Sequence, residues 1–196
     1  MSADPPSLLY LHGLNSSPTS RKASELVAVM TTLGLVGRLR VPALHHHPRQ
    51  AIAQLEALIA ELGRPVLVGS SLGGYYATFL AERHGLKALL INPAVRPHRL
   101  FDGYLGPQQN LYSGETWELT EDHVQALAEL DVPPPQDPAR YQVWLQTADE
   151  TLDYRQAAVH YRACALRIQA GGDHGYQGFA ERLPALLAFA GFASAL

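Results

Sequence analysis

A regular alternation of short apolar segments and amphipathic segments constrains the fold of this chain more than any other feature. Six apolar runs typical of strands occupy residues 7–10, 38–41, 65–68, 87–91, 142–146 and 165–168. Apolar residues recur at helical spacing in four of the segments between and after them, at residues 23–33, 52–62, 72–80 and 179–187. Strands that alternate with helices predict an α/β fold, with a doubly wound, mostly parallel sheet of about six strands and helices on both faces.

One long segment interrupts this alternation. Residues 94–140, just before the fifth strand, are rich in Pro, Gly, Tyr and Gln and contain one clear helical pattern, at about residues 119–130. Insertions of this length inside a compact domain are usually functional. We therefore expect a cap or lid within a single domain that spans residues 1–196.

The strongest chemical signal directly follows the third strand. The sequence Gly69-Ser70-Ser71-Leu72-Gly73 matches the pattern G-x-S-x-G, with an apolar strand before it and an amphipathic helix after it. This context is typical of a nucleophile elbow, where a sharp strand-to-helix turn exposes the serine hydroxyl and leaves no room for side chains two residues away. A plain glycine-rich turn is the alternative. The context favours Ser71 as a catalytic nucleophile and the α/β-hydrolase fold.

A serine at neutral pH needs a base, and that base needs an acid behind it. In this fold the chain order is serine, acid, histidine. His174 follows the sixth strand in a glycine-rich loop, and Asp149 follows the fifth strand. Glu150 and Asp153 remain alternatives to Asp149, because strand ends predicted from sequence are uncertain by a few residues.

Acyl transfer also needs donors for the developing oxyanion. We expect one to be the backbone N–H of Leu72, just after the nucleophile, and the second to be the N–H of Leu14, in the loop after the first strand. His12 lies in that same loop, and its position favours a structural role over that of a base.

Other chemically suggestive residues favour structural roles. Adjacent histidines such as those at residues 45–47 seldom bind one ion together, so we predict no metal site and no cofactor. Cys164 lies in an apolar run and is expected to be buried rather than nucleophilic. Tyr75 and Tyr76 fit core packing, although either could border a pocket. Within the insertion, packing and substrate contact both stay open for four residues: Arg96, Tyr104, Tyr112 and Trp117.

Composition narrows the possible partners. The net charge is -3, with acids and bases mixed along the chain and no basic block, which argues against nucleic acid. The apolar runs are far shorter than the roughly 18 residues that a membrane span needs. The first residues show neither the cationic nor the long apolar region of a secretory signal. We expect a cytoplasmic protein with a small-molecule substrate, no membrane association and no obligate protein partner.

Several motifs together resemble those of the small bacterial YqiA-type esterases. They are Tyr10-Leu11-His12-Gly13-Leu14-Asn15-Ser16-Ser17, the elbow with Gly74-Tyr75-Tyr76-Ala77, Ile91-Asn92-Pro93-Ala94, Tyr104-Leu105-Gly106, Asn110-Leu111-Tyr112-Ser113-Gly114-Glu115 and Gly171-Gly172-Asp173-His174. The resemblance covers nearly the whole chain, and Ser71, Asp149 and His174 match the family's triad positions. One departure is Ala148, where a glycine is expected before the acid.

The resemblance implies a serine esterase that hydrolyses short-chain acyl esters through an acyl-enzyme intermediate. An acyl-CoA thioesterase or a lactonase with the same triad is an alternative enzyme. A non-catalytic binding module with this fold is an alternative from another class, because fold alone does not prove activity.

Overall fold

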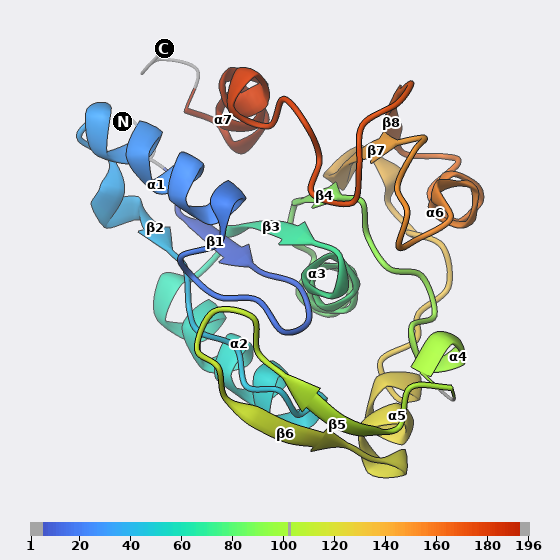
Figure 1. Ribbon diagram of the computed structural model, residues 1–196. Coiled ribbons are helices and arrows are strands. Elements are labelled where there is room, and N and C mark those ends of the chain that lie inside the picture. The colour runs from blue at the N-terminus through green and yellow to red at the C-terminus, as the bar shows by residue number, and fades with distance from the viewer. Residues whose placement is uncertain (1–5, 102, 193–196) are drawn as a thin grey trace.

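The computed structural model describes residues 6–101 and 103–192 and has a six-stranded parallel sheet at its centre (Figure 1). The strand order is β2-β1-β3-β4-β7-β8, and every neighbouring pair is parallel. The strands are β1 (Leu8–Leu11), β2 (Leu39–Arg40), β3 (Val66–Ser70), β4 (Ala88–Ile91), β7 (Tyr141–Gln146) and β8 (Ala165–Gln169). All six predicted strands are present, each within two residues of its expected ends.

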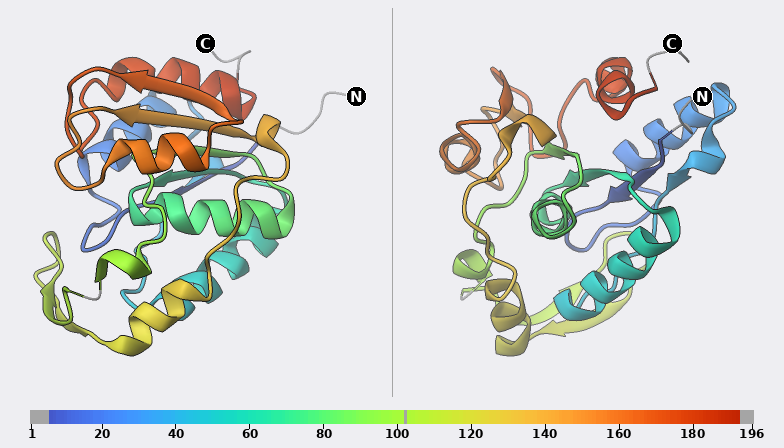
Figure 2. Two further views of the ribbon diagram at one scale, coloured as in Figure 1. Left: turned by 90° about the vertical axis from the view of Figure 1, so that its right-hand side faces the viewer. Right: turned by 180° about the vertical axis from the view of Figure 1, so that it is seen from behind.

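Helices cover both faces of the sheet, as Figures 1 and 2 show. The helices α1 (Arg21–Thr32) and α7 (Leu183–Ala190) pack on one face. The helices α2 (Pro48–Leu62), α3 (Leu72–His84) and α6 (Tyr154–His160) pack on the other. Short 3₁₀ turns η1 (Val36–Arg38), η2 (Pro138–Arg140) and η3 (Ala180–Arg182) complete the connections.

The buried strands supply apolar side chains to both faces of the sheet, because successive side chains of a strand point to opposite sides. In β1, Leu8 and Tyr10 pack against α1 and α7, whereas Leu9 and Leu11 pack against α2 and α3. All four are at most 1% exposed. Strands buried on both faces read as continuous apolar runs, which is why the sequence predicted them well.

The insertion, called the cap below, contains more structure than expected. Between β4 and β7 it contains a short helix α4 (His98–Phe101), an antiparallel hairpin of β5 (Gly106–Gln109) and β6 (Thr116–Leu119), and helix α5 (Glu121–Ala128). Figure 1 shows the hairpin beside α2, at the end of the molecule away from α1 and α7. The predicted helix at 119–130 is therefore present but shorter, and the hairpin was not predicted.

The chain reverses its direction of travel across the sheet between β1 and β3. It first adds β2 beside β1, then returns to the other side of β1 and continues outward to β8. Ligands in doubly wound sheets bind beyond the carboxyl ends of the strands at such a switch point. The switch point of this sheet lies between β1 and β3. No helix among the described residues is long and apolar enough to cross a membrane.

Candidate active site

Ser71 occupies a strained turn between β3 and α3. Its backbone angles are φ 56° and ψ -122°, a conformation that L-residues rarely adopt. The turn depends on neighbouring glycines: a Cβ at Gly69 would collide with the Gly73 backbone, and one at Gly73 with the carbonyl of Leu11. This is the local geometry expected from the G-x-S-x-G pattern.

The structure brings Ser71, His174 and Asp149 into one chain of hydrogen bonds. His174 Nε2 lies 3.0 Å from Ser71 Oγ, and His174 Nδ1 lies 2.9 Å from Asp149 Oδ2 and 3.0 Å from Oδ1. A carboxylate can only accept, so Nδ1 carries the proton and Nε2 is left to accept from the serine hydroxyl. The imidazole is thus held in the tautomer that a base for Ser71 requires.

The surroundings of Asp149 favour its charged form. Its side chain is only 2% exposed, and burial by itself raises the pKa of this carboxyl. Hydrogen bonds from His174 and from the backbone amides of Leu152 and Thr151, at 2.8 and 2.9 Å, outweigh burial and hold the pKa of Asp149 below its ordinary value. The carboxylate beside His174 is therefore ionised at neutral pH.

The two alternative acids lie in other positions. Glu150 accepts a hydrogen bond from the backbone N–H of His174, at 2.9 Å, and does not contact the ring. Asp153 caps α6 by accepting from the N–H of Arg155 and forms an ion pair with that side chain. Among the three candidate acids, Asp149 alone contacts the imidazole.

Leu14 and Leu72 both border the cavity in which Ser71 and His174 lie. Leu72 is the first residue of α3, so its N–H has no acceptor within the helix. The Leu14 loop passes directly beside the serine, because a Cβ at Gly13 would lie 3.1 Å from Ser71 Cβ and 3.5 Å from Oγ. The residues of both predicted oxyanion donors thus lie close to the nucleophile.

His12 connects this loop to its neighbour, as expected. Its Nδ1–H donates to the carbonyl of Gly13 at 2.9 Å, and its Nε2 accepts from the N–H of Leu44 at 3.1 Å. Burial lowers the pKa of the ring, which is 5% exposed. With both ring nitrogens occupied, His12 supports the loop.

Asn92 and Gln146, to which the sequence assigned no role, hold the loop of His174. Asn92, just after β4, donates from Nδ2 to the carbonyls of Asp173 and His174 at 3.1 and 3.2 Å, and its Oδ1 accepts from the N–H of Gln146 at 3.0 Å. Gln146 in turn bonds to the backbone of Asp173 and Gln177. A sequence signal existed, since Asn follows a buried strand and is one of the few side chains that tolerate φ 40°.

Helix α1 supports the same loop from the other side. Arg21 donates to the carbonyls of Gly175 and Tyr176 at 2.7 and 3.1 Å, and Lys22 donates to the carbonyl of Gly175 at 3.0 Å. Burial lowers the pKa of Lys22 to about 8, and the nearby charge of Arg21 acts in the same direction. The position of His174 is therefore fixed from β4, β7 and α1.

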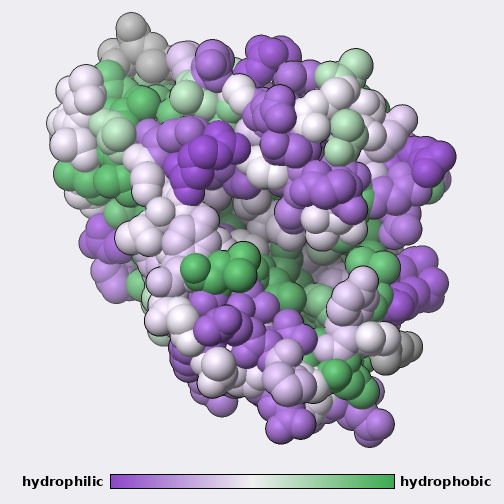
Figure 3. Space-filling view, viewed as in Figure 1, coloured by the Kyte–Doolittle hydropathy of each residue, from purple (hydrophilic) through white to green (hydrophobic). Residues whose placement is uncertain are grey.

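The cavity over Ser71 has a volume of about 370 Å³ and is mostly apolar. Six residues of the insertion line it, namely Ala94, Pro97, Leu100, Phe101, Tyr104 and Gln108. Near the middle of the face in Figure 3, hydrophobic and neutral side chains line a hollow that hydrophilic ones surround. Of the insertion's aromatic residues considered from sequence, Tyr104 borders this cavity, whereas Tyr112 and Trp117 do not.

Trp117 instead fixes the hairpin to the loop of Leu14. Its Nε1 donates to Asn15 Oδ1 at 2.8 Å, and its ring stacks on His46 with centroids 4.8 Å apart. Asn15 also donates to Gln108 Oε1, and its carbonyl accepts from the N–H of Leu111. The cap and the loop of one predicted oxyanion donor are therefore a single hydrogen-bonded unit.

The histidine run also contacts the cap. His47 caps α2 and pairs with Asp122 at 2.8 Å, and His46 Nδ1 lies 3.3 Å from Nε2 of the buried His123. Within the described residues, no three His, Cys, Asp or Glu side chains are grouped so as to hold a metal ion. Cys164 is half-buried, and burial raises the pKa of its thiol to about 11, which makes it a poor nucleophile.

Comparison with known proteins decides the family. Residues 7–191 match the Uncharacterised protein family UPF0227. The chain belongs to this family. UPF0227 is the YqiA family, so the resemblance drawn from the motifs is confirmed. A UPF0227 protein of Shewanella woodyi is 31% identical over 104 residues, which cover 50% of this chain and 55% of the relative. The chain thus aligns with about half the length of this curated relative.

Solved structures show the same fold. Mouse alpha/beta hydrolase domain-containing protein 10 matches with a TM-score of 0.71 at 13% identity, over 96% of this chain and 90% of that one. Est1E from Butyrivibrio proteoclasticus, with ferulic acid bound, matches with a TM-score of 0.70 at 16% identity, over 96% and 88%. These similarities establish the α/β-hydrolase fold for this member of UPF0227.

Proposed function

We propose that this protein is a serine hydrolase that cleaves short-chain acyl esters through an acyl-enzyme intermediate. One observation carries the proposal: the hydroxyl of Ser71, on a strained elbow, lies 3.0 Å from a histidine whose other nitrogen is bonded to a buried carboxylate. A turn that only connects a strand to a helix needs neither the strain nor the ordered imidazole.

In the first stage, Ser71 Oγ attacks the ester carbonyl carbon while His174 Nε2 takes the hydroxyl proton. The carbonyl oxygen becomes an oxyanion, which the N–H groups of Leu14 and Leu72 stabilise. Asp149 stabilises the imidazolium. The C–O bond to the leaving group then breaks as His174 donates its proton to the departing alkoxide, which leaves as an alcohol.

In the second stage, water attacks the acyl-enzyme. His174 takes a proton from the water, the second oxyanion forms in the same place, and Ser71 leaves as its proton returns from His174. The products are a carboxylic acid and the free enzyme. The cycle balances with water as the only co-reactant.

The cavity supports a short acyl group. Its volume of about 370 Å³ is at the lower end of ligand pockets, which span roughly 300–1,000 Å³. Phe101 and Tyr104 of the cap border it, so a long chain would have to leave the cavity or displace the cap. Esters and thioesters use the same triad, and acyl transfer from either leaving group fits this mechanism.

Covalent labelling tests the proposal directly. A fluorophosphonate should modify the protein once, and peptide mass spectrometry should place the adduct on Ser71. Ser71→Ala should abolish labelling and reduce the rate of p-nitrophenyl butyrate hydrolysis by several orders of magnitude. The melting temperature should stay nearly unchanged. Ser70→Ala is not a neutral control because Ser70 is buried, so Ser113→Ala in the exposed hairpin turn serves instead.

Two results would contradict the proposal. An adduct on Ser70 or Cys164 would move the nucleophile. A well-folded protein that neither labels nor hydrolyses esters or thioesters of any acyl length would favour a non-catalytic binding module.

A further inference from the structure

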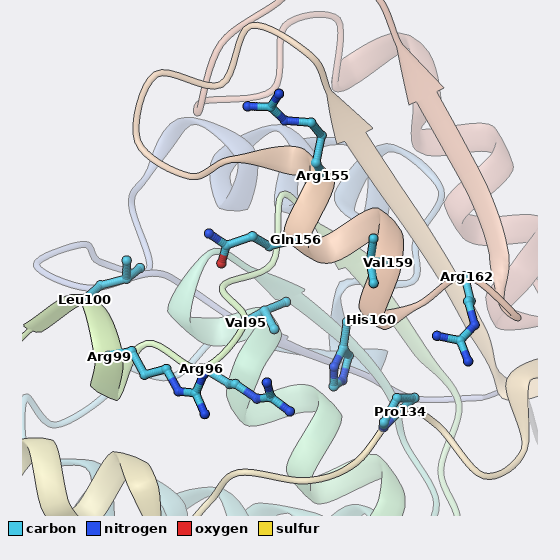
Figure 4. Close-up of a pocket in the computed structure, with 10 residues that line it drawn as sticks. All are labelled: Val95, Arg96, Arg99, Leu100, Pro134, Arg155, Gln156, Val159, His160 and Arg162. Atoms are coloured by element: carbon cyan, nitrogen blue, oxygen red, sulfur yellow. The ribbon is translucent and has the colours of Figure 1, made fainter.

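A groove lined by arginines lies beside the catalytic cavity. It has a volume of about 630 Å³ and runs between α4, α6 and Pro134 (Figure 4). Four of its lining residues are arginines, and none is acidic: Arg96, Arg99, Arg155 and Arg162. They come from two segments that are far apart in sequence, Arg96 and Arg99 from one and Arg155 and Arg162 from the other, and the chain as a whole has a net charge of -3. The groove is therefore a local concentration of positive charge on an acidic protein.

Two of these arginines have no carboxylate partner among residues 6–101 and 103–192. Arg96 pairs with Asp131 at 3.4 Å, and Arg155 pairs with Asp153 at 2.8 Å and points away from the other three in Figure 4. Neither Arg99 nor Arg162 forms an ion pair or a side-chain hydrogen bond within those ranges. Their guanidinium groups are free to bind an anion without breaking an existing contact.

The groove and the catalytic cavity adjoin at Leu100. Leu100 borders both spaces, and a small cavity between them is lined by Leu100, Leu152 and Gln156. Leu152 in turn borders the cavity of Ser71 and His174. A ligand attached to Ser71 can thus extend past Leu100 to the arginines while remaining in contact with the protein.

We propose that this groove binds a phosphate group of the substrate, at the end remote from the scissile ester bond. The planar guanidinium donates paired N–H groups that match phosphate oxygens, and charge-assisted bonds of this kind are about twice as strong as neutral ones. A dianion with three terminal oxygens can accept from Arg96 and Arg99 together, which lie one turn apart and beside each other in Figure 4, whereas a carboxylate offers two oxygens and one charge. The inference rests on the proposed esterase function, since it names the class of ester that Ser71 cleaves.

A matched series of esters tests the groove. The substrates are butanoyl monoesters of linear diols of increasing length, each prepared with the far hydroxyl free or phosphorylated. Phosphorylation should raise kcat/KM at least about tenfold at the chain length that spans Leu100, mainly through KM. The double variant Arg96→Gln/Arg99→Gln should remove this advantage and leave kcat/KM for the unphosphorylated esters unchanged.

A control separates the groove from net charge. Arg167→Gln removes a cation from the exposed strand β8, outside the groove, and should keep the full phosphate advantage. Equal loss in Arg167→Gln would overturn the proposal, because long-range attraction would then account for the effect. The proposal would also be overturned if the wild-type protein cleaved the free and phosphorylated esters with equal kcat/KM at every chain length. In that case the esterase function would stand.

Binding to the Ser71→Ala variant distinguishes failure of the groove from failure of the esterase function. Calorimetry with the phosphorylated diols should show binding that the double variant loses, even if no ester is ever hydrolysed. No binding by calorimetry would overturn the inference. The protein could instead sediment with phosphatidate vesicles, lose this binding in the double variant, and show no higher kcat/KM for the phosphorylated soluble esters. That result would also overturn the inference and assign the groove to a lipid headgroup.

Discussion

The Asn92 side chain offers a sharp test of how the histidine is positioned. Asn92→Gly removes its three hydrogen bonds, two to the carbonyls of Asp173 and His174 and one from the N–H of Gln146. Glycine accepts φ 40° without strain, so the substitution does not confound side-chain loss with backbone strain. Asn92 is 2% exposed, so the groups that lose their bonds are shielded from bulk water.

The expected magnitudes follow from these contacts. Each lost bond is worth about 1 kcal/mol, and the buried N–H of Gln146 loses its acceptor, so the free energy of unfolding should fall by about 3–4 kcal/mol. For a domain of this size that corresponds to a drop of roughly 6–15 °C in melting temperature. A displacement of His174 by about 1 Å should reduce kcat about 100-fold, with little change in KM.

The assay is steady-state hydrolysis of p-nitrophenyl butyrate together with thermal unfolding, below the melting temperature of every variant. Leu187→Ala is the matched control, because it empties a fully buried site in α7 and costs about 2–5 kcal/mol without touching the loop of His174. It should lose stability and keep kcat. If Asn92→Gly loses stability but keeps kcat within about threefold of wild type, Asn92 does not position the base.

Three further outcomes are expected. Asp149→Asn should reduce kcat by roughly 10⁴, as loss of the acid does in serine proteases. Asp153→Asn should leave kcat nearly unchanged, because Asn also caps a helix and only the exposed ion pair with Arg155 is lost; the reverse order would assign the acid to Asp153. Across p-nitrophenyl esters from acetate to palmitate, kcat/KM should rise about fourfold for each methylene that fits and then fall, and a steady rise to palmitate would show that the cap opens. Burial and then the charges of His47 and His46 lower the pKa of His123 to about 4. The unfolded chain therefore binds a proton at His123 near pH 6.5, whereas the folded chain does not until about pH 4. Urea unfolding should show a free energy of unfolding that is constant above about pH 7 and falls from about pH 6.5 toward 4. His123→Gln should reduce this fall, and an equal pH dependence in both proteins would assign the fall to another group.

The main elements of the sheet could be predicted because their residues are unambiguous. Leu8 to Leu11 are buried on both faces, and such continuous apolar runs separated by helical stripes admit few other folds. The elbow around Ser71 was recognisable because its glycines are required by contact with the neighbouring backbone. His174 and Asp149 followed from their places after the last two strands.

The cap hairpin could not be predicted from its own residues. Strand β5 reads Gly106-Pro107-Gln108-Gln109, without apolar alternation, and its side chains are half-exposed or exposed. Its position depends on hydrogen bonds between the cap and Asn15 and Ser16, which are nearly a hundred residues away in sequence. Helix α6 was also missed, because its seven residues contain a single fully buried position, Ala157.

The arginine groove shows the same limit. Arg96 and Arg162 are separated by three α-helices and three strands in sequence, and no local pattern relates them. Asn92 was visible as part of a motif, but its contacts with the loop of His174 depend on the order in which β4, β7 and β8 pair.

The hydrogen bonds between the hairpin and Asn15 also bear on how this family can diverge. The three proposed triad residues lie outside the segment between β4 and β7, so we expect substitutions in that segment to change which ester is accepted and to leave the proposed triad in place. Gln108 and Trp117 are an exception within this segment, because both bond to Asn15 in the loop of Leu14. A chimera that receives the cap of another protein should therefore keep its activity only if Asn15, Gln108 and Trp117 are transferred together. A substitution at one of these three positions should require a compensating substitution at another.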